Sequence, residues 1–534
     1  MTPHLLMFIM FPITIGLLLY ILKHRLVKII AVATEILLFS MSLWYILNIG
    51  DQSIMMLLVN APLPYGMALR IDQLSATMLL LNNFLFLCMV VYSLKRPYMN
   101  RLFIFLFLSL QGMINALFLS TDFFNVYILI EVATIAVSIL IMYKKDSQSM
   151  YDGMIYLLVN MVAMGFFLLG IGFLYKTFGV LDFVTIESMI PNLENKRVML
   201  LPFSLLITGV SLKAALMPLF SWLPKAHGTA SAPAVVSAIL SGIFVKVGVY
   251  LLIRMMSIFS VAIDLQSFFL VLGFLTALSG FMFAMSQTDI KLILAYHTIS
   301  QIGLILIGIS GMRDQNNFGG VYHILSHGVF KSLFFLVSGI LVQHFKTRKI
   351  KNMTGLWQSS KLVSIVLMFA ILSITGAPFF SGGYSKYFIT YGYDNAVLKW
   401  LFVIINAGTM ASFIKFFRVI FSKPLGKPEK LNVDVNQKVV IMTMAAACFL
   451  LGFGGDLITN TIHHQPYTFN ALSQITKLPI YLITYLMSYM VFRYVLENSK
   501  ALKFIKSIEL SFNSINLAIV SFFFATLAYL TITF

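Results

Sequence analysis

The sequence predicts an all-α, polytopic integral membrane protein with about 14–16 transmembrane helices, arranged as two inverted five-helix repeats that each contain a broken helix. Two observations predict this class. Of the 534 residues, 60% are hydrophobic and only 10% are charged, and the mean hydropathy is +0.92, whereas a soluble domain carries roughly 25% charged residues. The apolar residues also gather in runs of about 20, which is the length that crosses a bilayer.

Sixteen apolar runs are candidate spans of the membrane. They are 5–22, 29–48, 71–94, 102–120, 123–143, 154–176, 198–217, 232–253, 264–286, 291–310, 319–344, 362–391, 397–421, 437–458, 474–494 and 511–533. The basic loops 23–28, 94–101, 144–146, 346–351 and 422–430 then all fall on one side. The positive-inside rule makes that side the inner one, so both termini are expected outside. We expect the protein in the cell membrane of a bacterium or an archaeon.

The spans predict four segments. They are 1–100, the N-terminal membrane helices; 101–255, the first five-helix repeat; 256–425, the second repeat with its preceding helix; and 426–534, the C-terminal membrane helices. Within the last segment, the stretch 495–510 alternates lysines with apolar side chains. It is either a short amphipathic helix on the inner membrane surface or an ordinary basic loop.

The composition excludes several kinds of site. The net charge of +18 is spread over short loops, which argues against nucleic acid as a partner. Cys88 and Cys448 lie inside apolar runs, which excludes a disulfide framework and a cysteine-ligated iron–sulfur or zinc site. The sequence contains no phosphate loop and no dinucleotide-binding motif. We therefore expect no cofactor, no metal and no catalytic site in this chain, and the electrons of any redox reaction would run elsewhere.

Two acidic residues lie well inside apolar runs. A charge within the bilayer costs about 3 kcal/mol or more, so it is retained where it has a partner or a function. Glu131 lies in the middle of "FFNVYILIEVATIAVSILIMY" and is interpreted as functional, with a structural ion pair as the alternative. Glu35 lies in "KIIAVATEILLFSMSLWYIL", and its role is left open.

The stretch "VSLKAALMPLF" combines Lys213 with Pro218. The proline is expected to break the helix, because it lacks an N–H group and its ring clashes with the preceding turn. Broken helices at membrane depth are tolerated where they line a hydrated cavity. The lysine and the helix break together predict a functional site.

Lys246 is the fourteenth residue of "PAVVSAILSGIFVKVGVYLLI". Desolvation disfavours the charge of such a lysine and a nearby carboxylate favours it, so the residue is suited to exchange a proton. The stretch "YHILSHGVFK" places His323, His327 and Lys331 at i, i+4 and i+8, nearly on one helical face. Zinc would need a further acid or cysteine, so a proton-conducting row is predicted, with structural hydrogen bonding as the alternative.

A second helix break is expected in "SITGAPFFSGGYSK", where Pro378 and two glycines precede Lys386. It lies about 170 residues after the first break and five helices away, which predicts an inverted repeat with its sites near the membrane midplane. The role of His297 is left open. Four cations nearer helix ends are expected to snorkel to the membrane surface: Lys225, Arg254, Lys415 and Arg418.

The ordered motifs carry a resemblance to a known family. The stretches "KAALMPLFSWLPKAHGTASAPAVVSAILSGIFVKVGVYLLIR", "DIKLILAYHTISQIGLILIGI", "YHILSHGVFKSLFFLVSGIL" and "GAPFFSGGYSKYF" resemble the antiporter-like subunits of respiratory complex I, membrane-bound hydrogenases and Mrp-type cation/proton antiporters. The strongest match covers roughly residues 100 to 420. Two positions depart from the family: Lys225 stands where an acid is frequent, and His297 stands where a serine is frequent.

The resemblance implies specific roles for these residues. It implies two inverted units, 102–253 and 291–421, and a glutamate–lysine pair matched by Glu131 and Lys213. It further implies a central row of ionisable residues and a terminal charge on the second broken helix. The row is matched by Lys246, His323, His327 and Lys331, and the terminal charge by Lys386.

We expect a proton- or cation/proton-translocating subunit whose partners are other membrane subunits of a multisubunit complex, the lipid bilayer and the transported ion. The ion is a proton, with sodium or potassium as further candidates. Peripheral redox subunits are expected if the complex is an NADH-quinone oxidoreductase or a hydrogenase, and none if it is an Mrp-type antiporter. The alternatives are a stand-alone transporter of a small solute, a membrane subunit for inorganic-carbon uptake, and a membrane-bound transferase, which the short, acid-poor loops disfavour.

Overall fold

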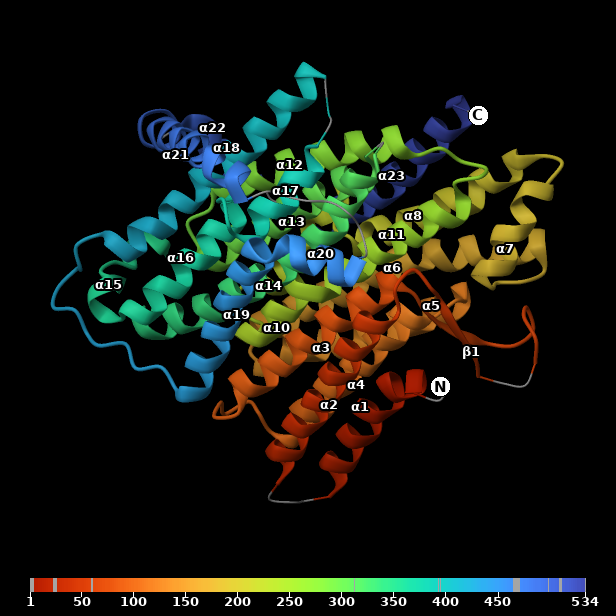
Figure 1. Ribbon diagram of the computed structural model, residues 1–534, viewed down its shortest axis with the longest axis horizontal. Coiled ribbons are helices and arrows are strands. Elements are labelled where there is room, and N and C mark those ends of the chain that lie inside the picture. Colours follow the sequence, from red (N-terminus) through yellow and green to blue (C-terminus); the bar gives the residue numbers. More distant parts are fainter. Residues whose placement is uncertain are drawn as a thin grey trace. The chain divides into compact units, whose positions relative to one another are not determined.

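The computed structural model describes residues 4–22, 26–58, 61–311, 313–391, 393, 395–463, 471–497, 499–508 and 511–533. Most of these residues lie in helices (Figure 1). Fourteen of the described helices are long and apolar enough to cross a membrane. The chain is therefore a multi-pass integral membrane protein, which confirms the predicted fold class. It forms two compact units, the first comprising Met1–Ala226, Ile243–Leu265 and Leu510–Phe534, the second His227–Gly242 and Gln266–Glu509.

The first unit contains a layer of N-terminal helices, a β-hairpin and the first helix break. Its elements are α1 (His4–Ile21), α2 (Val27–Asn48), β1 (Ile54–Leu57), β2 (Ala68–Ile71), α3 (Gln73–Ser93), α4 (Arg101–Leu119), α5 (Phe123–Ile141), η1 (Met142–Lys144), α6 (Ser147–Phe178), α7 (Phe183–Met189), η2 (Ile190–Asn192), η3 (Lys196–Met199), α8 (Leu200–Lys213), η4 (Leu219–Ser221), α11 (Val245–Phe259) and α23 (Phe512–Thr533). The strands pair antiparallel, with Ile54 opposite Ile71. Two elements, α9 (Trp222–His227) and the π-helical η5 (Leu240–Phe244), carry the chain between the units.

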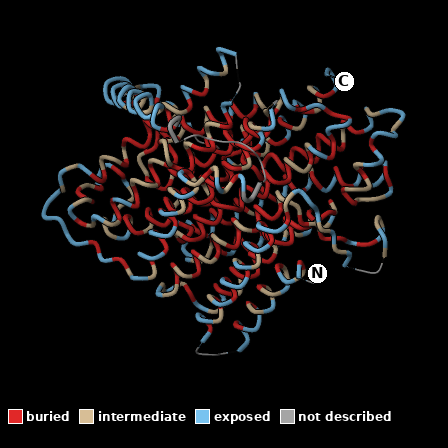
Figure 2. The backbone as a smooth tube through the Cα atoms, viewed as in Figure 1, coloured by how far each residue is buried: buried red, intermediate tan, exposed pale blue. Residues whose placement is uncertain are grey.

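The second unit is built around α14. Its elements are α10 (Ala234–Ile239), α12 (Gln266–Ser286), α13 (Ile290–Ile309), α14 (Asp314–Phe345), η6 (Ile350–Asn352), α15 (Leu356–Ser359), α16 (Lys361–Thr375), α17 (Ser381–Ile389), α18 (Ala396–Phe421), α19 (Val435–Phe453), α20 (Gly455–His463), α21 (Ala471–Val491), the π-helical η7 (Phe492–Leu496) and α22 (Lys500–Ser507). In the apolar window of α14, 94% of the residues are buried, against 11% in that of the span containing α21 (Figure 2). The first helix therefore forms the core of the unit, and the second presents apolar side chains outward, as contact with lipid requires.

The two units repeat one local pattern. α6 and α14 each have 32 residues, and Ser147 and Asp314 at their starts are 167 residues apart. Phe123 and Phe183 bond to Leu181 and Thr121 through backbone N–H···O contacts of 3.1 and 2.8 Å. At the same spacing, the N–H groups of Ile290 and Ile350 bond to the carbonyls of Arg348 and Thr288 at 3.0 and 2.9 Å. Each unit thus contains a 32-residue helix and the same two backbone contacts, whereas the inversion of one repeat and the four-segment division stay predictions.

The helix breaks explain how the sixteen predicted runs relate to the fourteen long helices. The run 198–217 contains α8, which ends at Lys213, and the run 362–391 is divided into α16 and α17. The stretch 495–510 contains α22, so the short helix predicted there is confirmed for Lys500–Ser507. Residues 23–25 of the first basic loop lie outside the described part of the chain.

Candidate functional site

The first helix break follows directly after Lys213. The N–H groups of Ala215 and Leu216 bond back to the carbonyls of Leu212 and Ser211 at 2.9 and 3.0 Å, and Ala215 adopts the left-handed conformation with φ of +54°. This pattern ends helices, and it usually carries glycine at the left-handed position. Pro218 follows and cannot continue the helix. Lys213 thus lies at the C-terminal end of a helix that stops inside the unit, with its side chain buried.

The side chain of Lys213 contacts α5 one helical turn after Glu131. Its Nζ donates to Thr134 Oγ1 at 2.6 Å, and the Thr134 hydroxyl donates to the Ile130 carbonyl at 2.7 Å. Because Thr134 follows Glu131 by three residues on one helix, the two side chains lie on neighbouring positions of one face. The charges of Glu131, which is half-buried, and Lys213 interact. The structure therefore brings the predicted pair together, and it adds Thr134, which the sequence analysis did not identify.

Lys246 lies near the start of α11, directly after the π-helical turn η5, and is fully buried. Such turns are rare and frequently occur at functional sites. Gly248 brings α11 against the first helix break, because a Cβ atom there would lie 2.3 Å from the Ala214 nitrogen and 2.6 Å from the Lys213 carbonyl carbon. Gly248 was not predicted as a site residue, although small residues in apolar runs favour close helix packing.

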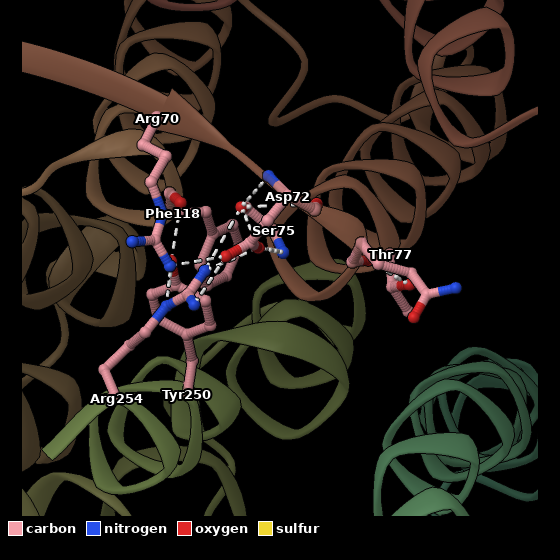
Figure 3. A network of polar contacts seen from close by, with 8 residues as sticks. Arg70, Asp72, Ser75, Thr77, Phe118, Tyr250 and Arg254 are labelled. Carbon is pink, nitrogen blue, oxygen red and sulfur yellow. Dashed lines mark hydrogen bonds and ion pairs between the residues drawn. The ribbon is translucent and has the colours of Figure 1, made fainter. Parts of the chain in front are cut away.

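A polar network fixes the far end of α11 (Figure 3). Arg254 forms an ion pair with Asp72 at 2.7 Å, and its Nε donates to the Tyr250 hydroxyl at 3.0 Å. Tyr250 donates in turn to the Phe118 carbonyl at 2.7 Å. Burial raises the pKa of Asp72, but the hydrogen bonds and charge of Arg254 and the bonds from Ser75 hold that pKa well below its ordinary value. Arg254 thus has a counter-charge at the residue that directly precedes α3, and its snorkelling to the membrane surface stays a prediction.

The second helix break repeats the backbone motif of the first, 161 residues later. The N–H groups of Gly376 and Ala377 bond to the carbonyls of Ser373 and Leu372 at 3.2 and 2.9 Å, and Gly376 has φ of +77°. Pro378 follows, as predicted. The start of α17 packs directly on this end, because a Cβ atom at Gly382 would lie 1.8 Å from the Ser373 oxygen.

Lys386 reaches back from α17 to the broken end of α16. Its Nζ donates to the Ile374 carbonyl at 2.7 Å and to Asn406 Oδ1 at 3.1 Å. A cation is stabilised at this position because helix C-termini carry partial negative charge and free carbonyl groups. Both acceptors are uncharged, like the Thr134 hydroxyl at Lys213, but Lys213 also lies in the field of the Glu131 charge.

A row of buried ionisable groups on α14 leads to the second break. His323 bonds through Nδ1 to Ser385 Oγ at 2.8 Å and through Nε2 to Gln301 Oε1 at 3.1 Å. The His327 ring lies one turn further, parallel to the His323 ring, with centroids 6.2 Å apart. Lys331 follows after another turn and donates to the Leu294 carbonyl at 2.7 Å. His323 therefore contacts the residue that precedes Lys386 in the chain, and all four predicted residues lie within the second unit.

Two further predictions concern His297 and Lys415. His297 is fully buried on α13, with its ring 4.8 Å from that of Phe413, and it lies in the field of Lys331, Lys386 and Lys415. The Lys415 Nζ donates to the Met285 and Gln287 carbonyls at 2.6 and 2.8 Å, and its snorkelling stays a prediction. These carbonyls at the end of α12 satisfy the ammonium group within the protein.

Lys386 also lines a cavity of about 510 Å³. Polar side chains of the lining include Tyr387, Lys399, Asn406, Gln474 and Lys477. Among the described lining residues there is no aspartate or glutamate. A water molecule occupies about 30 Å³ in the liquid, so this cavity has room for a group of waters beside the lysine. Of the predicted row and its terminal lysine, only Lys386 is among the described lining residues.

The described residues contain no group of three or more His, Cys, Asp or Glu side chains placed to hold a metal ion. The polar groups of the site are instead lysines, histidines, Glu131 and neutral hydrogen-bond partners at two helix breaks. This arrangement, in a polytopic helical protein, defines the class of ion-handling membrane proteins.

The comparison with known families is more specific. Residues 120–414, more than half of the chain, match the family described as NADH:quinone oxidoreductase/Mrp antiporter, TM, and the chain belongs to this family. The resemblance stated from the sequence motifs is therefore confirmed.

Relatives and solved structures agree with this assignment. The chain is 28% identical to an NADH-quinone oxidoreductase subunit (the N type) of Desulforudis audaxviator over 431 residues, covering 76% of this chain and 85% of that protein. It is 26% identical to a Na(+)/H(+) antiporter subunit (the D type) of Alkalihalophilus pseudofirmus over 464 residues, covering 84% and 94%. A chain of the Mrp complex from Dietzia sp. DQ12-45-1b has the same fold, with a TM-score of 0.79, 19% identity and coverage of 91% of this chain and 99% of that chain.

Proposed function

We propose that the chain is an antiporter-like subunit of a multisubunit membrane complex, and that it translocates protons, or exchanges a cation for protons, along its buried ionisable residues. One observation carries the proposal: Lys331, His327 and His323 succeed one another along α14, His323 bonds to Ser385, and the next residue, Lys386, lines a cavity. The names of the relatives, one an oxidoreductase component and the other an antiporter component, support the choice of function.

Lys386 is suited to release a proton. Its ammonium group is held by a backbone carbonyl and an amide oxygen, both neutral. An ion pair would cost far more to neutralise in a medium of low dielectric constant. The neighbouring cavity offers water to receive the proton. Lys386 thus forms the end of the row, and protons reach it through His323 and Ser385.

The Glu131–Lys213 pair is proposed as the gate of the first unit. While Glu131 lies one turn from the Lys213 contact, its charge favours the protonated lysine. When the two separate, Lys213 loses that attraction and its proton becomes easier to release towards Lys246. The Thr134 hydroxyl is the partner that keeps the ammonium group in place between these states.

The test is proton transport by the reconstituted complex. Lys213→Ala is expected to abolish coupled transport, measured with a pH-sensitive dye in proteoliposomes, while assembly of the complex is retained. Lys176→Ala is the matched control, because Lys176 is an exposed lysine of the same unit. Unchanged coupled transport in Lys213→Ala would refute the proposal.

The cavity beside Lys386 also supports a second candidate, a transporter of a small solute, because its volume lies in the range of ligand pockets. Isolation of the complex in mild detergent, followed by mass spectrometry, separates the candidates. Flavin or iron–sulfur subunits would identify the pump arm of a redox complex. Small hydrophobic subunits alone would identify an Mrp-type antiporter. A chain isolated without partners would favour the solute transporter.

A further inference from the structure

Five buried polar side chains meet inside the N-terminal helices of the first unit, away from the row described above. They are Glu35 of α2, Asn82 and Asn83 of α3, and Gln111 and Asn115 of α4, and each is fully buried. Gln111 Nε2 donates to Glu35 Oε2 at 2.8 Å and to Asn83 Oδ1 at 2.9 Å. Asn82 Nδ2 donates to Asn115 Oδ1 at 2.8 Å, and Asn115 Nδ2 donates to Asn83 Oδ1 at 3.2 Å. The five residues therefore form one connected cluster near the middle of three apolar helices.

Three acceptor oxygens of the cluster have no hydrogen-bond donor among the described residues: Glu35 Oε1, Asn82 Oδ1 and Gln111 Oε1. The Asn83 Nδ2 donor likewise has no acceptor there. Buried polar atoms are nearly always satisfied, and an oxygen that lacks a donor is a potential ligand for a cation. A carboxylate and amide carbonyls are the oxygen ligands that hard cations prefer.

A proline in α1 adds a fourth helix to the cluster. Pro12 has no N–H group, so the Phe8 carbonyl one turn earlier loses its usual helical partner. Asn115 Nδ2 donates to this carbonyl at 3.0 Å. A side chain of the cluster thus satisfies the carbonyl group that the proline of α1 leaves free, as expected for a specific site.

The charge of the cluster selects the ligand. Glu35 is its only carboxyl group, and among the described residues the hydrogen-bond donor to that carboxyl group is the neutral amide of Gln111. A buried charge must be paired or must coordinate a metal ion. A monovalent cation neutralises one carboxylate, whereas a divalent ion would leave a net positive charge in an apolar interior.

We infer that this cluster is a binding site for a monovalent alkali cation, in which Glu35 and the amide oxygens of Asn82 and Gln111 are ligands. A proton on Glu35 is the alternative occupant, so cation and proton exclude each other. The inference does not depend on the proposed transport role, because equilibrium binding measures it in the absence of any flux.

Thermal melting of the purified complex tests the site. Sodium or potassium chloride is expected to raise the melting temperature of the wild-type complex in a saturable manner, relative to choline chloride of equal ionic strength, because a ligand of the folded state stabilises it. The salt with the lower half-saturation concentration identifies the preferred ion. Glu35→Gln is expected to remove the shift. Glu194→Gln, the same change at an exposed position of the same unit, is expected to keep it.

Two outcomes would overturn the inference: equal melting of the wild type in all three salts, or an undiminished shift in Glu35→Gln. A Lys386→Met complex that retains the shift would show that the site is independent of the proposed row. This variant distinguishes failure of the binding site from failure of the proposed function.

A second variant keeps the test decisive if Glu35→Gln does not fold. Asn82→Asp supplies a second carboxylate, so it is expected to gain stabilisation by calcium chloride that the wild type lacks. A folded Asn82→Asp complex without a calcium response would count against Asn82 as a ligand.

Lowering the pH is expected to weaken binding of the monovalent ion. Cys88 is another titratable side chain in the field of Glu35. The control is therefore Cys88→Ser, which is expected to keep the pH dependence.

Discussion

The two helix breaks share a backbone motif and differ in what stabilises the lysine beside them. At the first, Lys213 belongs to the broken helix and reaches a threonine next to a glutamate on α5. At the second, Lys386 belongs to the following helix and reaches back to a free carbonyl and an asparagine. The same interruption of a helix can therefore place a lysine near a carboxylate, as for Lys213, or beside neutral dipoles only, as for Lys386. The Lys386 ammonium is the easier one to neutralise, and Lys386 lines the cavity.

The largest expected effect comes from removing the titration of Lys386. Both Lys386→Met and Lys386→Arg are expected to lower proton transport about a hundredfold or more, because methionine carries no proton and arginine does not release one. The measurement is dye-reported proton flux in proteoliposomes. Lys399→Met is the control, since Lys399 lines the same cavity but is exposed. Full transport in Lys386→Arg would show that only the charge matters at the second break.

The next effect tests how tightly α11 packs on the first break. Gly248→Ala places a methyl carbon 2.3 Å from the Ala214 nitrogen. It is therefore expected to destabilise the protein by about 1–3 kcal/mol. Gly172→Ala in α6 is the matched control, because nothing lies within 4 Å of the added atom. The control is expected to be neutral or stabilising by up to about 1 kcal/mol, since alanine favours helices. Thermal melting compares the two, and equal stability would mean that the first break can move apart from α11.

A smaller effect is expected from the link between α14 and the second break. His323→Gln retains hydrogen-bonding capacity towards Ser385 and Gln301 but cannot carry the proton of an imidazole. Proton transport is expected to fall about tenfold to a hundredfold, in the range of general acid–base groups. His344→Gln on the same helix is the control and is expected to transport normally. If both variants transport equally, protons reach Lys386 by another route.

Loss of the Thr134 hydroxyl tests the contact of the first break. Thr134→Val leaves the Lys213 ammonium without its partner and is expected to cost about 1.5–3 kcal/mol, as hydrogen bonds to charged groups do. Thr134→Ser restores the hydroxyl and is expected to restore both stability and coupling. A melting temperature unchanged in Thr134→Val would show that Lys213 rests on Glu131 alone.

The smallest effect concerns the left-handed residue of each break. Ala215→Gly is expected to stabilise the first break by up to about 1 kcal/mol, because glycine adopts positive φ without steric cost. Gly376→Ala is expected to destabilise the second break by about 1–2 kcal/mol. Chemical unfolding of the two variants measures their free energies of unfolding. Changes of the same sign in the two variants would contradict an equivalent geometry of the two breaks.

The sequence alone predicted the membrane fold, the two breaks and the charges beside them. A proline interrupts helical hydrogen bonding and a lysine is costly in the bilayer, so both stand out in an apolar run. The sequence could not predict neutral partners such as Thr134 and Asn406. Such residues are common in membrane helices, and their contacts depend on packing between distant segments. The counter-charge of Arg254 was missed for the same reason, since Asp72 lies 182 residues earlier in the chain.

The buried amides around Glu35 illustrate the same limit. A glutamate inside an apolar run attracts attention because its charge is costly there, so Glu35 was recognised as unusual. Gln111 and Asn82 carry no charge, and their spacing along the chain gives no sign of a shared site. Only the packing of α2, α3 and α4 joins their amide groups and the Glu35 carboxyl group in one hydrogen-bonded cluster.

The 32 residues of α6 and α14 bear on the thickness of the membrane. At 1.5 Å per residue each helix is about 48 Å long, whereas the hydrocarbon layer is about 30 Å thick. Even at a tilt of about 40°, the upper end of the usual range, each helix rises about 37 Å along the membrane normal. At least one turn of each therefore stands beyond the hydrocarbon. A thinner or thicker membrane would change how many residues at these helix ends are exposed to water. The middle of each helix would remain in the hydrocarbon layer.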